Sequence, residues 1–102
     1  MNSKHFVLML AGLLASGASQ AVSLYVGKSK AEAVCAQCHG IRMPSSEALF
    51  PPLGGRDPDY LKMAIKQYRD KTRKSDIMNA IAGSLADADI NDIAHYYGSV
   101  KP

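Results

Sequence analysis

The sequence contains no third cysteine, and this absence limits what its two thiols, Cys35 and Cys38, can do. No other sulfhydryl competes for either of them. A disulfide between the two would close a very short loop, which constrains little of the unfolded chain and therefore adds little stability. The pair is better explained by a chemical role than by a structural crosslink.

The sequence also lacks convincing β-strand runs, internal repeats and a large excess of one charge. Without strand runs, the expected fold class is all-α. Twelve basic residues stand against nine acidic ones, which gives a formal net charge of +3. A charge this small does not suggest a nucleic-acid partner.

A hydrophobic run long enough to cross a membrane is absent as well. The apolar stretch Phe6–Ala15 is too short to span a bilayer, follows the basic residue Lys4 and precedes small residues that end at Ala21. This order predicts a cleaved signal peptide at residues 1–21, with a retained anchor as the alternative. The remaining residues, 22–102, are enough for one small domain, which we expect in the periplasm.

The sequence Cys35-Ala36-Gln37-Cys38-His39 has the pattern by which a c-type haem is attached covalently. Each thiol can form a thioether with one vinyl group of the haem, and the adjacent histidine can bind the iron. One haem c, covalently bound through Cys35 and Cys38, is therefore the expected cofactor.

Two other kinds of site contain a similar pair of cysteines. A thioredoxin-like redox pair lies at a strand-to-helix turn, whereas the flanks of this motif are alanine-rich and helical. A zinc site could combine Cys35, Cys38, His39 and His95. The adjacent positions of Cys38 and His39 would strain the binding of one tetrahedral ion.

Apolar residues recur at helical spacing in four segments of the chain. The first spans residues 26–37, and a long loop rich in proline and glycine follows it. The second segment begins with Asp57 as the N-cap and Pro58 at the first helical position. The third opens at Ser75, and the fourth contains the apolar residues between Ile90 and Tyr97. These segments predict an all-α domain.

The motifs together resemble a class I cytochrome c. The resemblance covers the chain from about Gly27 to Val100. Within this class, the chain is similar to the single-haem bacterial periplasmic type, whose relatives carry two such units in tandem. It implies the cytochrome c fold, with about four helices wrapped around one covalently bound haem. The matching motifs are Cys35–Gly40, Phe50–Gly55, Asp76–Met78 and Asp92–Tyr97.

The resemblance also implies the two iron ligands, His39 and Met78. Two other methionines are alternatives, but Met43 follows His39 too closely to reach the opposite face of a macrocycle. Met63 lies inside the second helix, where methionine more often fills gaps in the core. We expect His95, the remaining alternative, to face solvent.

Further positions take structural roles by the same resemblance. The Pro51 carbonyl would accept a hydrogen bond from the iron-binding histidine, and Leu53 would pack on the haem. Gly27 and Tyr96 match the positions at which the first and last helices cross.

Two features depart from the family pattern. Asp87 is expected to cap the last helix, because alanine replaces the usual serine or threonine before it. Arg56 replaces a common glutamine and is a candidate partner for a haem propionate.

The expected function is one-electron transfer between redox proteins such as a cytochrome reductase, a terminal oxidase or a dehydrogenase. Two protein ligands on the iron leave no position for a substrate, so we expect no enzymatic activity. The protein would meet a membrane only through its partners, as a monomer or as a subunit of a hetero-complex. A stripe of basic residues on the second helix is either a solvated face or a docking surface for an acidic partner: Lys62, Lys66, Arg69 and Arg73.

Two alternative functions remain open. The chain could be the haem-binding electron-transfer subunit of a larger dehydrogenase, such as a flavocytochrome c sulfide dehydrogenase. It could also bind a gas or peroxide, which would require an open sixth position on the iron.

Overall fold

The computed structural model describes residues 21–42 and 50–101. Except for Ala21, the predicted signal peptide lies outside the described residues, and so does Met43. Within the part of the chain that is described, all regular structure is helical and no strand occurs. The predicted all-α class is therefore confirmed.

The first helical region is longer than the predicted segment 26–37 and contains a local irregularity. It runs without a break through α2 (Leu24–Lys30), the π-helical turn η1 (Ala31–Cys35) and α3 (Ala36–His39). Gly40 follows α3 with a positive φ of 69° and ends the helix. The periodicity of the sequence did not reveal the π turn, which widens the helix over the residues that end at the first cysteine, Cys35.

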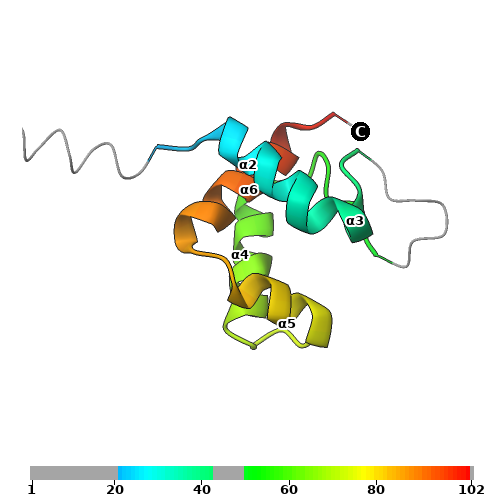
Figure 1. Ribbon diagram of the computed structural model, residues 1–102, viewed down its shortest axis with the longest axis vertical. Coiled ribbons are helices and arrows are strands. Elements are labelled where there is room, and N and C mark those ends of the chain that lie inside the picture. Colours follow the sequence, from blue (N-terminus) through cyan, green and yellow to red (C-terminus); the bar gives the residue numbers. More distant parts are fainter. Residues whose placement is uncertain (1–20, 43–49, 102) are drawn as a thin grey trace, which may run out of the picture.

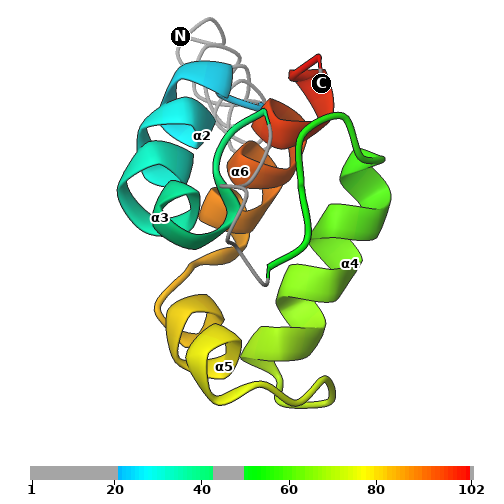
Figure 2. The ribbon, with the colours of Figure 1, turned by 90° about the vertical axis from the view of Figure 1, so that its right-hand side faces the viewer.

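Three more helices complete the domain, and Figure 1 shows their arrangement. They are α4 (Pro58–Arg69), α5 (Asp76–Gly83) and α6 (Asp87–Ser99). Helices α2 and α6 cross each other, α4 lies along α6, and α5 folds back beside the C-terminal end of α4 (Figure 2). The core lies where α6 meets its neighbours, and its fully buried large side chains are Ile90, Ile93 and Tyr97.

The crossing of α2 and α6 depends on Gly27, as the sequence predicts. A Cβ atom at this position would lie 2.1 Å from the Asp92 carbonyl oxygen and 2.9 Å from the Cβ of Tyr96. No side chain fits in that space, so only glycine allows the two backbones to come this close. The Asp92 carboxylate also accepts a hydrogen bond of 2.9 Å from the Ser23 backbone N–H, which fixes the start of α2.

The structure confirms the predicted starts of α4 and α5. The Asp57 carboxylate accepts a hydrogen bond from the Tyr60 N–H at 3.1 Å, with Pro58 at the first helical position. The Ser75 hydroxyl accepts one from the Met78 N–H at 3.3 Å. Each cap satisfies a backbone donor that has no partner within its helix.

The predicted cap of α6 by Asp87 is wrong. The backbone of Ala86 is extended and that of Asp87 is the first in the helix, so Ala86 occupies the N-cap position. The carboxylate of Asp89 reaches back and accepts the Ala86 N–H at 3.0 Å. That hydrogen bond lowers the pKa of the Asp89 carboxyl. The Asp87 carboxylate instead forms an ion pair with Arg69 at 2.7 Å, which lowers the pKa of Asp87.

Helix α4 ends in a Schellman motif in which a lysine takes the position usual for glycine. The Thr72 N–H donates to the Gln67 carbonyl at 3.0 Å, and the Lys71 N–H donates to the Tyr68 carbonyl at 3.2 Å. Lys71 has a φ of 66°, in the left-handed region that L-amino acids disfavour.

We therefore expect Lys71→Gly to stabilise the domain by about 0.5–1 kcal/mol, because glycine adopts the left-handed conformation without a Cβ clash. Denaturant unfolding of the two proteins measures this difference. Lys74→Gly is the matched control, since Lys74 lies in the same loop without a positive φ and should gain nothing. Equal or lower stability of Lys71→Gly would show that the left-handed turn costs little here.

Of the helices in the described ranges, none is both long and apolar enough to cross a membrane.

Candidate functional site

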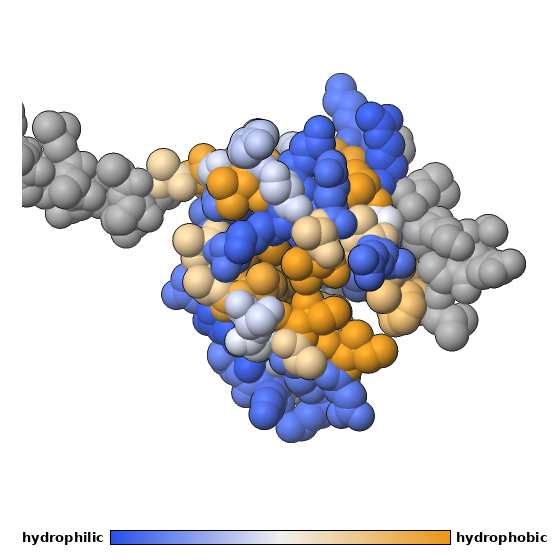
Figure 3. Space-filling view, in the orientation of Figure 1, coloured by the Kyte–Doolittle hydropathy of each residue, from blue (hydrophilic) through white to orange (hydrophobic). Residues whose placement is uncertain are grey.

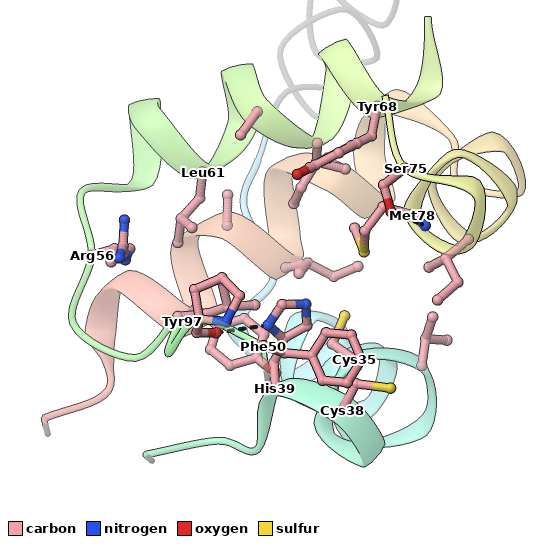
Figure 4. Close-up of a pocket in the computed structure, with 18 of the residues that line it drawn as sticks. Cys35, Cys38, His39, Phe50, Arg56, Leu61, Tyr68, Ser75, Met78 and Tyr97 are labelled. Atoms are coloured by element: carbon pink, nitrogen blue, oxygen red, sulfur yellow. Dashed lines mark hydrogen bonds between the residues drawn. The ribbon is translucent and has the colours of Figure 1, made fainter. Parts of the chain in front are cut away.

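A cavity of about 230 Å³ opens between the first helical region, α4 and α5. Its walls are mostly apolar, and Figure 3 shows hydrophobic residues gathered in the middle of this face of the molecule. Figure 4 shows that both cysteines, His39 and Met78 project toward the same space. The predicted site residues that line the cavity are Cys35, Cys38, His39, Pro51, Leu53 and Met78.

The two cysteines enter the cavity from adjacent turns, Cys35 at the end of η1 and Cys38 in α3. Both are free thiols. Burial raises the pKa of the Cys35 thiol to about 11, because the apolar surroundings disfavour the thiolate. A thioredoxin-like pair lies at a strand-to-helix turn, whereas Cys35 lies within a continuous helical region with no strand before it in the described residues, so the position does not fit that alternative.

The zinc alternative required His95 beside the two cysteines. His95 lies on α6, does not line the cavity, and has its Nδ1 atom 2.9 Å from the carbonyl oxygen of Asn91. Across residues 21–42 and 50–101, no three His, Cys, Asp or Glu side chains are grouped to hold a metal ion. The four proposed zinc ligands are therefore not brought together.

His39 is held in a fixed orientation at the wall of the cavity. It is only 8% exposed, and its Nδ1–H donates a hydrogen bond of 2.7 Å to the Pro51 carbonyl, as predicted. Because a carbonyl can only accept, the ring carries its proton on Nδ1 and leaves the lone pair of Nε2 for a metal. The ring of Phe50 packs edge-on against His39, with centroids 5.8 Å apart. Sequence reasoning did not assign this contact to Phe50.

The three methionines considered as ligands have different positions. Met78 projects from α5 into the cavity. Met63 is 44% exposed on α4 and does not line the cavity, so the expectation that it fills a gap in the core is wrong. Met43 lies outside the described residues. Among the described methionines, Met78 alone reaches the site.

The edge of the cavity near the start of α4 is formed by Leu53 and Arg56. Leu53 is half-buried and packs against the hydrophobic core. The Arg56 guanidinium donates to the Pro52 carbonyl at 3.0 Å and lies 5.8 Å from the centre of the Tyr60 ring. Figure 4 places Arg56 on the side of the cavity away from the two cysteines.

The basic stripe on α4 makes several contacts within the molecule. Arg69 pairs with Asp87, and Lys62 lies 3.3 Å from the Asn91 side-chain oxygen. Arg73, in the loop after α4, donates two hydrogen bonds to the Gln67 side chain. These contacts join α4 to α6 and order the loop. The stripe therefore has a structural role that the helical spacing alone did not indicate.

A long-range hydrogen bond fixes the chain just after His39. The Tyr97 hydroxyl, from α6, donates to the Gly40 carbonyl at 2.7 Å, and the Tyr97 side chain is fully buried. Burial is the main cause of the raised pKa of Tyr97, so its hydroxyl remains a donor at all ordinary pH values. Two segments that are distant in the sequence are thereby held together at the wall of the cavity, which Tyr97 also lines.

Tyr97→Phe should destabilise the domain by about 1 kcal/mol, because the Gly40 carbonyl loses its buried partner while the ring remains in place. Thermal or denaturant unfolding measures the change. Tyr25→Phe removes the same hydroxyl from a side chain that is 81% exposed and should leave stability unchanged. Equal effects of the two variants would contradict a specific role for the Gly40 contact.

The residues around the cavity fit a haem of the c type. Two neighbouring thiols are available for thioether bonds, and an imidazole nitrogen and a thioether sulfur are known axial ligands of haem iron. The apolar walls suit the faces of a porphyrin, since burying apolar surface is favourable.

Comparison with known proteins agrees with this chemistry. Residues 26–101 match the cytochrome c family model. The chain is 41% identical over 68 residues to cytochrome c-554(548) of Halomonas halodenitrificans, covering 64% of this chain and 82% of that protein. It is 35% identical over 101 residues to cytochrome c4 of Pseudomonas aeruginosa, covering 99% of this chain and 50% of the relative.

A third relative is the cytochrome subunit of sulfide dehydrogenase of Chlorobaculum tepidum. The two are 31% identical over 67 residues, which covers 66% of this chain and 60% of that subunit. The chain spans half or less of the length of several relatives, including the cytochromes c4 of Thiocapsa roseopersicina and Pseudomonas aeruginosa and the thiosulfate dehydrogenase electron acceptor of Stutzerimonas stutzeri. The family match and the cavity chemistry lead to one conclusion. The chain belongs to the cytochrome c family of electron carriers rather than enzymes, and its Cys35 and Cys38 have the arrangement for covalent attachment of haem c.

Proposed function

We propose that this protein carries single electrons in the periplasm, with His39 and Met78 as the two axial ligands of one haem c. One observation carries the proposal: the imidazole, the thioether and both thiols line the same cavity (Figure 4). The haem would supply a reversible Fe(III)/Fe(II) couple when bound. With an imidazole and a thioether filling both axial positions, no substrate would reach the metal, which suits a carrier.

The chain contributes to this role by orienting its ligands. The hydrogen bond from His39 to Pro51 fixes the imidazole ring and makes Nε2 a stronger base toward a metal. A thioether ligand favours the reduced form of the iron and raises the reduction potential. The apolar walls of the cavity would limit the access of water to the iron. This exclusion of water affects the reduction potential, as the ligands do.

Electrons would enter and leave at the exposed mouth of the cavity. Two large apolar side chains lie there, Phe50, which is 37% exposed, and Ile77, which is 55% exposed. Such a small uncovered apolar area suits brief and weak complexes with other redox proteins. A cytochrome reductase, a terminal oxidase or a dehydrogenase are the proposed partner classes. Similarity to the thiosulfate dehydrogenase electron acceptor supports a dehydrogenase as the donor.

The proposed location follows from residues 1–21, whose basic start, apolar stretch and small residues have the order of a signal peptide. Export also agrees with the chemistry, because c-type haem is joined to protein outside the cytoplasm. Contact with a membrane would then occur only through partners.

Mass spectrometry and voltammetry of the exported protein test this proposal. Material from a bacterial host that attaches haem should have the mass of residues 22–102 plus one haem, and should show one reversible one-electron wave. A colourless product with two free thiols would contradict the haem assignment. A mass of all 102 residues plus one haem would contradict the predicted cleavage but not the haem assignment.

A second function is favoured by the similarity to the cytochrome subunit of sulfide dehydrogenase. In this case the protein would serve as the electron-transfer subunit of a larger enzyme. Purification of the native protein distinguishes the two functions. Constant co-elution with a flavoprotein would support the subunit role, whereas elution as a single small chain would support the mobile carrier.

A further inference from the structure

The side chain of Asn79 joins three segments of the chain beside Met78. Its Nδ2 amide donates to the Tyr68 carbonyl at 2.7 Å and to the Arg73 carbonyl at 2.9 Å. Its Oδ1 atom accepts the Ser75 backbone N–H at 3.1 Å. The amide has two N–H donors and one oxygen, and all three take part.

From this geometry we propose that Asn79 is the residue that positions the Met78 thioether in the cavity. The inference rests on the proposed role of Met78 as an iron ligand. Asn79 itself does not line the cavity, so it would act only through the backbone that carries its neighbour.

The three partners of Asn79 belong to different parts of the turn between α4 and α5. Tyr68 lies in the last turn of α4, and its carbonyl also accepts the Lys71 N–H of the turn that ends the helix. Arg73 lies in the middle of the loop, and Ser75 is the N-cap of α5. One side chain therefore fixes the end of one helix, the loop and the start of the next helix.

Met78 lies inside this network. Its own backbone N–H donates to the Ser75 hydroxyl at 3.3 Å, and the next residue, Asn79, donates its N–H to the Ser75 carbonyl at 2.7 Å. The positions of Ser75 and Asn79 thus determine where the Met78 Cα lies and which way its side chain leaves the helix.

Hydrophobic burial contributes little to the loop that leads into α5. Most residues of the loop 70–75 are exposed. Because few apolar contacts hold this loop, the orientation of the start of α5 depends strongly on the Asn79 hydrogen bonds. Without them, Met78 would sample positions outside the cavity.

The test uses the haem-loaded, oxidised protein and added imidazole, which competes with a weakly held thioether for the iron. We expect Asn79→Ala to lower the apparent Kd for imidazole about fivefold for each net hydrogen bond lost. The red absorbance band of iron–thioether bonding should weaken in parallel. Asn79→Leu, which keeps the volume but not the hydrogen bonds, should behave in the same way.

Asn91→Ala is the matched control. It removes a side-chain amide whose oxygen accepts from Lys62 on the far side of α4, and Asn91 does not line the cavity. We expect its imidazole affinity to equal that of the unmodified protein. If Asn79→Ala does not fold, Asn79→Asp keeps the acceptor for Ser75 and replaces the two donors with a carboxylate oxygen that the Tyr68 and Arg73 carbonyls repel, so it should also lower the apparent Kd for imidazole.

The outcomes separate this inference from the proposed function. If the unmodified protein lacks the iron–thioether band, or Met78→Ala retains it, the ligand assignment fails. If that band depends on Met78 but Asn79→Ala and Asn79→Leu keep both the band and the imidazole affinity, the positioning role is wrong. If Asn79→Leu keeps the band and the imidazole affinity while Asn79→Ala loses them, the effect comes from packing and the hydrogen-bond mechanism is wrong.

Discussion

Gly27→Ala is expected to destabilise the domain by roughly 3 kcal/mol or more, because it forces α2 away from α6. The new Cβ would lie 2.1 Å from the carbonyl oxygen of Asp92 and 2.7 Å from its carbonyl carbon. Both atoms belong to the backbone of a buried helix turn, so neither can move aside as a flexible side chain would. The helices must separate, and the contacts of Ala31 and Ile93 in the core weaken with them.

Denaturant unfolding of the haem-loaded protein measures this loss as a lower midpoint of the transition. Gly83→Ala is the matched control, since a Cβ at the end of α5 would meet no atom within 4 Å. That variant should be as stable as the unmodified protein or more stable by about 0.4–1 kcal/mol, because alanine makes the unfolded chain less flexible than glycine does. Similar midpoints for the two variants would show that the crossing tolerates a side chain.

Met78→Ala is expected to have the largest effect on the redox chemistry. Loss of the thioether should abolish the iron–thioether absorbance band and lower the reduction potential. Axial ligands set haem potentials over a range of about 0.8 V, so a shift on the order of 0.1 V or more is reasonable. The reason is that a thioether stabilises the reduced iron, whereas the water or imidazole that replaces it does not.

Met63→Ala provides the comparison for this variant. Met63 is 44% exposed and lies outside the cavity, so its removal should change neither the spectrum nor the potential. Spectroscopy and voltammetry of both variants give the result directly. A normal band in Met78→Ala together with a lost band in Met63→Ala would reverse the ligand assignment.

Features that depend on neighbouring residues could be predicted from the sequence. The N-caps Asp57 and Ser75 depend on side chains that reach a backbone group three residues away, and the structure contains both. The Gly27 crossing and the hydrogen bond from His39 to Pro51 were expected from the resemblance to a known family. Both follow from motifs whose order along the chain is specific.

Other predictions failed, and for Asp87 a tertiary contact decided the outcome. Asp87 has the right residue type for a cap, but Arg69 holds its carboxylate on α4 while Asp89 takes over the capping. Asp87 shows that local patterns carry no information on which neighbour a side chain meets. Met63 was wrong for a local reason instead: it comes two residues after the buried Leu61, so it lies about 200° around α4 and is exposed.

The contacts of Asn79 and Tyr97 lay beyond sequence reasoning for the same reason as the ion pair of Asp87. Tyr97 meets a carbonyl 57 positions away, at Gly40. Asn79 meets two carbonyls in a turn whose shape depends on the left-handed conformation of Lys71. A backbone carbonyl has no signature in the sequence, so a side chain that binds one cannot be matched to it beforehand.

The crossing at Gly27 joins the earliest helix of the described chain to the latest one, α6. A chain that emerges from a ribosome or a translocation channel N-terminal end first releases the attachment motif well before its closing partner. Until α6 arrives, we expect both sulfurs to stay accessible to an enzyme that inserts the pigment. Delaying the release of α6 (Asp87–Ser99) should therefore lengthen the period in which maturation can occur.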